Sequence, residues 1–232
     1  MNNSRKLLRI AINDTWLFNS KNVCRFSTSN RKLNDKVYEY RAYYVKPEYV
    51  KSFVELSKQY MDIRMSHSKL TGYWISELGG INDMVHIWEY DSLSQRAGVR
   101  AGLAGDEAWM TNFIAKMMPW LIRQDNYLMK CLPGTDVVDP PNTGGVYELQ
   151  MFSYHGKPLE DVSKSVQEIT RSDATLLGSW YKIVGVLNTG FMLWHHPTPD
   201  NIVSSPYNGN PDAGITMVQS RMLLPVPWSP MK

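Results

Sequence analysis

The chain has little cysteine, no long apolar run and no known catalytic signature, and each absence removes a class of function. Only two of its 232 residues are cysteines, Cys24 and Cys131, too few for a disulfide framework or a cysteine-based metal site. No apolar run approaches the roughly 20 residues that cross a bilayer. Phosphate-loop, dinucleotide-binding, nucleophile-elbow and zinc-protease motifs are all missing. We therefore expect a globular protein with no transmembrane segment, no metal and no catalytic set, and hence not an enzyme.

Positive charge is concentrated near the N-terminus. The net charge is +3, but residues 1–34 hold seven basic residues and one acid, which leaves 18 basic and 21 acidic residues for the rest. The body of the chain therefore lacks the positive excess that binding to a phosphate backbone requires. We expect no nucleic-acid partner.

The first 34 residues are typical of a mitochondrial targeting segment. They are rich in Arg, Lys, Ser and Asn, nearly free of acid, and able to form an amphipathic helix. The run Arg25, Phe26, Ser27 is typical of a matrix-processing site and predicts cleavage near Phe26. We expect a mitochondrial protein, in the matrix by default. A disordered basic tail is the alternative interpretation.

The remainder of the chain contains an internal repeat. Six identities occur at a constant spacing of 106 residues within one ungapped stretch of about twenty. The pairs are Leu70 and Leu176, Gly72 and Gly178, Trp74 and Trp180, Gly79 and Gly185, Asn82 and Asn188, and Trp88 and Trp194. The repeat predicts a first unit over 35–133, a linker over 134–145 and a second, shortened unit over 146–232.

Each unit is predicted to run strand, helix, two strands, helix, strand. The expected elements of the first unit are strands at 37–45, 70–78, 84–90 and 124–132, a helix after Pro47, and a helical region over 92–120 broken near Gly105. In the second unit the first helix is expected to be about five residues shorter, and 197–214 is expected to be mainly loop.

This order of elements predicts an α+β fold. A βαββαβ unit forms a four-stranded antiparallel sheet with both helices on one face. The other face is apolar and needs a partner. We therefore expect tandem ferredoxin-like repeats that pair their sheets within one chain, in a dimeric α+β barrel-type fold.

Several motifs, in the same order in both halves, resemble the NIPSNAP family, and in particular its NIPSNAP3-like branch. The resemblance covers roughly residues 37–232 and rests on VYEYRAYYVKPEYVKSF, LTGYWISELGGINDMVHIWEYDS, GVYELQMFSYHGKP and the ending LLPVPWSPMK. It implies a tandem dimeric α+β barrel, a mitochondrial association and a non-enzymatic adaptor role. The implied partners are proteins: autophagy receptors during mitophagy, met on the cytosolic face when import fails, or components of vesicle transport. The family offers no catalytic residues to carry over.

Three side chains on one predicted strand suggest a ligand pocket. His86, Trp88 and Tyr90 alternate and so point to the same face. Together with Tyr38 and Tyr40 they are the candidate pocket for a small molecule, with haem as the candidate cofactor. This gives the alternative function, a ligand-binding protein or a monooxygenase-like or isomerase-like enzyme that uses the barrel cavity. The other interpretation is a packed sheet interface.

Three further residues are weaker candidates. Glu39 and Arg41 share one face of a predicted strand, where they could hold an anion, act as a general-base pair or form a structural salt bridge. His67 lies near the end of a predicted helix, where a cation suits the helix dipole. Neighbouring His195 and His196 would point to opposite faces of a strand, which is poor geometry for a metal. Homo-oligomers are a further expected assembly.

Overall fold

The computed structural model describes residues 36–232, apart from 142–143, 205–208 and 211–213. The expected targeting segment over 1–34, with its processing site at Arg25, Phe26 and Ser27, lies outside the described residues. Within the described residues, no helix has both the length and the apolar character that a membrane crossing requires.

The first half of the chain follows the expected order of elements. Its strands are β1 (Val37–Val45), β2 (Lys69–Leu78), β3 (Asp83–Tyr90) and β4 (Leu121–Cys131). Its helices are η1 (Pro47–Tyr49), α1 (Val50–His67), α2 (Leu93–Gly105), the π-helix η2 (Trp109–Ile114), α3 (Ala115–Met117) and η3 (Met118–Trp120). The predicted break near Gly105 is confirmed, because α2 ends there.

The second half has the same strands but less helix. Its strands are β5 (Val146–Tyr154), β6 (Thr175–Val184), β7 (Thr189–His196), β8 (Gly209–Asn210) and β9 (Ile215–Pro225). Its helices are α4 (Leu159–Gln167) and α5 (Asp200–Ser204). The expected shortening of about five residues is wrong, because α4 has 9 residues and α1 has 18. The segment predicted as loop contains α5 and β8.

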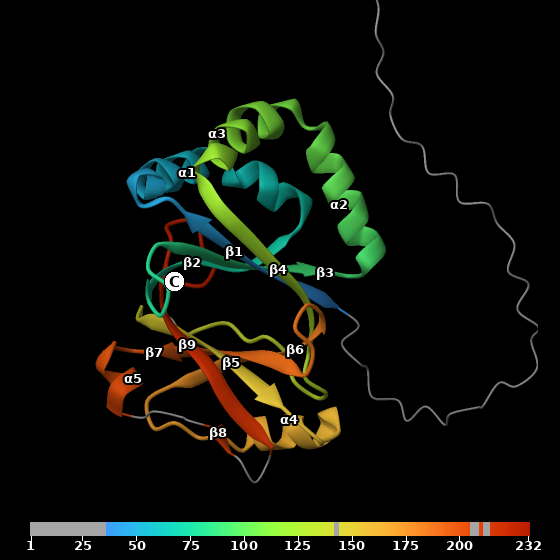
Figure 1. Ribbon diagram of the computed structural model, residues 1–232, viewed down its shortest axis with the longest axis vertical. Coiled ribbons are helices and arrows are strands. Elements are labelled where there is room, and N and C mark those ends of the chain that lie inside the picture. Colours follow the sequence, from blue (N-terminus) through green and yellow to red (C-terminus); the bar gives the residue numbers. More distant parts are fainter. Residues whose placement is uncertain (1–35, 142–143, 205–208, 211–213) are drawn as a thin grey trace, which may run out of the picture. The chain divides into compact units, whose positions relative to one another are not determined.

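The strands form one closed antiparallel barrel (Figure 1). The order is β2-β3-β1-β4 in the first half and β6-β7-β5-β9 in the second, and β8 extends the sheet beyond β9. Pairing of β4 with β6 and of β2 with β9 joins the halves at both edges. The predicted α+β barrel is therefore confirmed, and its closure comes from backbone hydrogen bonds between edge strands as well as from packing of apolar faces.

The repeated glycines and tryptophans have a common steric cause. The Trp74 indole folds over Gly72, where an added Cβ would lie 2.1 Å from the ring, and Trp180 covers Gly178 in the same way at 2.3 Å. A β-bulge follows Leu70 in β2, and its counterpart lies at the same position in β6. Both indoles are fully buried in the barrel. The glycines are needed because a larger side chain would displace these core tryptophans.

The two faces of the first sheet have different environments. The inner face contributes Tyr38 and Tyr40 to a core that fills the barrel, together with side chains from the second sheet. The outer face packs against α1, α2 and η2 around Phe53, Trp88 and Phe113. Figure 1 shows these helices over the first sheet and α4 beside the second. A strand residue of the first half therefore lies either in the barrel core or in the core under the helices, depending on the face to which it points.

Candidate functional site

The pairing of β1 with β3 decides which of the predicted site residues meet. Arg41 lies opposite His86, and Glu39 lies opposite Trp88. Directly paired residues share a face, so these four side chains and Tyr90 lie on the outer, helix-covered side.

The predicted five-residue pocket is therefore divided between two faces. Tyr38 and Tyr40 point into the barrel, whereas His86, Trp88 and Tyr90 point toward the helices. The physical reason is the two-residue period of a strand, which puts the even positions of β1 opposite the odd positions of β3. His67, at the end of α1, does not line the cavity described next, although its ring lies against Gly102 of α2.

A cavity of about 260 Å³ lies between the outer face of the first sheet and its helices. Its wall combines apolar and aromatic side chains with basic and other polar ones. The apolar and aromatic lining consists of Tyr43, Met61, Tyr73, Trp88, Leu103, Ala104, Trp109, Met110, Phe113, Ile114, Met117 and Met118. The polar lining consists of Arg41, Arg64, His86, Arg100 and Gln124, with no carboxylate.

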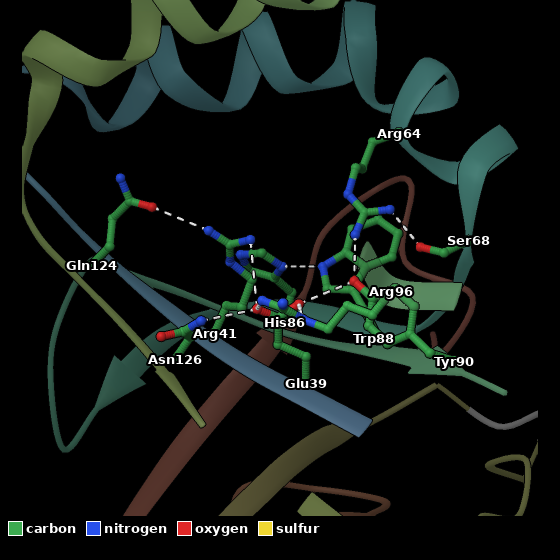
Figure 2. A network of polar contacts seen from close by, with 10 residues as sticks. All are labelled: Glu39, Arg41, Arg64, Ser68, His86, Trp88, Tyr90, Arg96, Gln124 and Asn126. Atoms are coloured by element: carbon green, nitrogen blue, oxygen red, sulfur yellow. Dashed lines mark hydrogen bonds and ion pairs between the residues drawn. The ribbon is translucent and has the colours of Figure 1, made fainter. Parts of the chain in front are cut away.

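Glu39 is the carboxylate nearest to this wall, and it is already bound (Figure 2). Arg96 donates two hydrogen bonds to it, at 2.6 Å and 3.2 Å, and Asn126 and Tyr90 each donate one at 3.0 Å. Burial raises the pKa of Glu39, but the contacts with Arg96, Arg41 and Asn126 outweigh it and hold that pKa at about 2. Glu39 is therefore ionised throughout the physiological range.

Arg64 is a buried cation with neutral hydrogen-bond partners. Its guanidinium donates to Tyr90 Oη at 2.8 Å and to Ser68 Oγ, and it lies 3.8 Å from the centre of the Trp88 ring. The residue is 4% exposed. Burial lowers the pKa of Arg64, yet a guanidinium remains protonated at any ordinary pH. The described ion pairs include none between Arg64 and a carboxylate.

The cluster therefore has more positive charge than its single carboxylate can balance. Arg96 forms two hydrogen bonds with Glu39, and the Arg41 guanidinium lies 3.8 Å from the same carboxylate. Arg41 and Arg64 both line the cavity, and exposed Arg100 lies at its edge. Buried charge is costly unless it is paired, so this wall favours an anion.

His86 contributes a neutral hydrogen-bond donor. Trp88 Nε1 donates to His86 Nδ1 at 2.6 Å, so the neutral ring carries its proton on Nε2. Burial, reinforced by the charges of Arg41 and Arg64, lowers the pKa of His86 well below its usual value. No described residue forms a hydrogen bond with His86 Nε2 or Tyr73 Oη, although both atoms are buried. Tyr73 stacks on His86 at 4.5 Å, and both residues line the cavity.

These residues do not fit haem. An axial histidine ligates iron through a ring nitrogen that carries no proton. In His86 the Trp88 indole N–H occupies Nδ1, and Nε2 carries the proton. Within the described residues, no three His, Cys, Asp or Glu side chains gather to hold a metal ion.

The second half has an equivalent carboxylate on its outer face, and there a partner arginine balances its charge. Glu148, the counterpart of Glu39, accepts from Arg171 at 2.6 Å and from Ser220 at 2.6 Å, and lies 3.1 Å from His196 Nε2. Gln150 also donates to it at 2.9 Å. Burial raises the pKa of Glu148, but these partners reduce it to about 2. Here one arginine faces one carboxylate.

Two substitutions explain why the halves differ. Gln150 occupies the strand position of Arg41, and Met192 occupies that of His86. The second half therefore lacks one of the two arginines and the neutral donor that face the cavity in the first.

Sequence reasoning missed Arg64, Arg100 and Tyr73. The available signal was the position of Arg64, which falls in the apolar stripe of α1 with Phe53 and Met61. A charged residue on the buried side of an amphipathic helix is unusual and indicates a buried polar site.

Comparison of the sequence with known proteins points to one family. A model of the NIPSNAP family matches residues 38–133. NipSnap homolog 3A from Pongo abelii is 29% identical over 228 residues, which cover 90% of this chain and 92% of that protein. The human NipSnap homolog 3A is 29% identical over 89% of this chain and 90% of its own length.

Among solved structures, a candidate monooxygenase from Fusobacterium nucleatum has the same fold. It aligns with a TM-score of 0.57 over 85% of this chain and 98% of its own, at 11% identity. At that identity the likeness concerns the fold alone. Family model and full-length relatives agree with the repeated motifs. The chain belongs to the NIPSNAP family, in the branch that contains the NipSnap homologs 3A and 3B.

Proposed function

We propose that this chain binds a small organic anion with an apolar body in the helix-side cavity of its first half. The observation that carries this proposal is the pair of arginines, Arg41 and Arg64, which line a cavity of about 260 Å³ while Glu39, the carboxylate beside Arg41, is held by Arg96. An anionic ligand would balance the excess charge, and charge-assisted bonds to guanidinium are among the strongest that a neutral-pH site offers.

The shape of the lining suggests the ligand class. Rings of Trp88, Trp109 and Phe113 suit a flat or aliphatic body, and Tyr73 Oη and His86 Nε2 are donors with no hydrogen-bond partner among the described residues. A carboxylate, enolate or sulfonate attached to an aromatic or aliphatic group would satisfy both parts of the wall. The proposal is for binding, because no residue of the lining is placed as a nucleophile beside a base.

Titration calorimetry with 2-naphthoate tests the charge requirement. The neutral 2-naphthamide, of nearly the same shape, is the matched ligand control. We expect the carboxylate to bind at least tenfold more tightly than the amide, which corresponds to about 1.4 kcal/mol. Equal affinity for the two compounds would mean that the arginines do not select an anion.

R41Q is the matched variant, because it gives the first half the residue that the second half has at Gln150. It should weaken 2-naphthoate binding about tenfold by removing one charge-assisted contact. The control is R123Q, since Arg123 is outside the cavity lining and 61% exposed. A loss of affinity in R123Q equal to that in R41Q would indicate a general electrostatic effect.

Mitochondrial location and an adaptor role are a second proposal, supported by family membership and by the basic, acid-poor segment 1–34. A folded barrel that binds a ligand can also be recognised by autophagy receptors. Fractionation with protease protection and N-terminal sequencing tests the location. A protected form that begins near Ser27 supports it, and a full-length cytosolic form contradicts it.

We also infer that the two halves are copies of one ferredoxin-like module. Their common strand order and the matched pairs of Gly72 with Trp74 and Gly178 with Trp180 support this. Co-expression of the halves, divided between β4 and β5, should yield a 1:1 complex joined at the two barrel edges. Failure of the halves to associate would count against independent modules.

A further inference from the structure

A buried lysine, Lys182 of β6, lies on the inner face of the barrel. The residue is 2% exposed, and lysine is rarely buried without a charged partner. Its Nζ contacts Met151 Sδ at 3.3 Å and lies 4.2 Å from the ring centre of Tyr127 and 4.5 Å from that of Phe191. The ammonium group is therefore surrounded by a thioether and two ring faces.

Asp125 and Asp83 are already paired with arginines. Asp125 accepts from Arg123 at 3.0 Å and from Tyr44 Oη at 2.9 Å. Asp83 forms an ion pair with Arg221 at 3.0 Å. In the described part of the chain, the ion pairs leave Lys182 without an acid of its own. Burial accordingly lowers the pKa of Lys182 to about 8.

A cavity of about 240 Å³ lies on the other side of the groups that cover Lys182, which is not itself one of the lining residues. All three groups that contact Nζ, from Met151, Tyr127 and Phe191, belong to its wall. The wall also carries the side chains of Tyr40, Tyr44, Arg123, Asp125, Leu149, Gln219 and Arg221. Met151 is unbranched and flexible, so a change of its rotamer would open a path from the cavity to the amine.

We propose that Lys182 is a reactive amine that condenses with a small aldehyde or ketone in the barrel cavity to form a Schiff base. The nitrogen lone pair attacks the carbonyl carbon, the C–O π bond breaks, and a proton passes from nitrogen to oxygen to give a carbinolamine. The hydroxyl then leaves as water, with one added proton, and a C=N bond forms. The reaction needs no oxidant, reductant or second substrate.

Three features of the cavity suit this step. At neutral pH about a tenth of an amine with this pKa is unprotonated, against fewer than one in a thousand for an ordinary lysine. Burial raises the pKa of Tyr127, so this residue of the cavity wall stays neutral and polar at the pH of the reaction. The protonated imine is a cation, and the ring faces of Tyr127 and Phe191 stabilise it as they stabilise the ammonium.

Reductive trapping of the full chain tests the proposal. The protein is incubated with benzaldehyde and cyanoborohydride near pH 7.5, and each lysine adduct is then quantified by peptide mass spectrometry. We expect Lys182 to be modified at least tenfold faster than Lys164, whose side chain is 73% exposed. K182M should remove that adduct and leave the others unchanged. The proposal is overturned if the wild-type protein modifies Lys182 no faster than Lys164.

M151A gives an independent readout of access. Removing the thioether from the wall should increase the rate at Lys182 severalfold and leave the rate at Lys164 unchanged. An unchanged rate at Lys182 in M151A contradicts entry from this cavity. Neither measurement depends on anion binding at Arg41, because the two cavities share no lining residue.

Discussion

Trp88 Nε1 donates a hydrogen bond to His86 Nδ1, two residues earlier on β3, over 2.6 Å. The contact fixes the tautomer of His86 and leaves Nε2–H as the donor on the cavity wall. The same indole ring supports the Arg64 guanidinium at 3.8 Å. Trp88 therefore orients both a neutral donor and a cation toward the proposed ligand.

Replacing Trp88 by Phe should disturb this arrangement. W88F removes the N–H, so the His86 ring no longer has a single preferred tautomer. We expect 2-naphthoate to bind about fivefold more weakly, the equivalent of one ordinary hydrogen bond, ~1 kcal/mol. Nitrogen NMR shifts of His86 should show one neutral tautomer in the wild type and a mixture in W88F. One unchanged tautomer in W88F would contradict the role given to Trp88.

H86M gives β3 the residue that β7 has at Met192. The fold should tolerate this change, because Trp194 in the second half has a buried Nε1 with no described partner beside that methionine. Circular dichroism should therefore show native secondary structure, whereas calorimetry should show at least a tenfold loss of 2-naphthoate affinity. Unchanged affinity would show that His86 Nε2 does not contact the ligand.

Glu39 should make the stability of the first half depend on acid. Its pKa in the folded protein is about 2, below the ordinary value of 4.5, so its contribution is complete above pH 4.5 and is lost as the pH falls toward 2. E39Q should lower the free energy of unfolding by ~3 kcal/mol at pH 7, because it leaves two partly buried arginines, Arg96 and Arg41, without their carboxylate. Denaturant titrations should show this difference shrinking between pH 4.5 and 2. A constant difference would contradict the ionised Glu39.

Lys182 should destabilise the folded protein at neutral pH, whereas Glu39 stabilises it. Its folded pKa is below that of an exposed lysine, so the unfolded chain binds more protons between about pH 8 and 10.5, and the wild type gains stability as the pH rises through this window. At pH 7 we expect K182M to be more stable than the wild type by ~2 kcal/mol, since methionine removes the buried charge. Thermal unfolding should show this advantage decreasing toward pH 10. A K182M variant less stable at pH 7 would indicate that the ammonium is stabilised by contacts stronger than its desolvation.

Much of the barrel follows from local patterns in the sequence. The hairpin turns were indicated by Gly79 with Asn82 and by Gly185 with Asn188, and all four residues have positive φ angles. Alternation and helical spacing located the elements of the first half. The exact length of α4 did not follow, because its sequence continues in polar residues that fit a helix or a loop equally well.

The site was less predictable because it depends on register between distant segments. Alternation along β3 correctly grouped His86, Trp88 and Tyr90, but one strand does not tell which residues of β1 share its face. The pairing of Arg41 with His86 determines which residues of β1 share that face, and this pairing is a property of the tertiary structure. Lys182 carried a comparable signal, because it shares the inward face of β6 with Trp180, where a charged residue is out of place.

A crystal structure of the protein with 6-bromo-2-naphthoate tests most directly whether an organic anion binds in the helix-side cavity. The anomalous signal of bromine locates the ligand whatever position is assumed for it. We expect one strong bromine peak among Trp88, Trp109 and Phe113, with the carboxylate within hydrogen-bond distance of Arg41 or His86 Nε2. A bromine peak inside the barrel or only at the surface, with the helix-side cavity free of ligand, would contradict it.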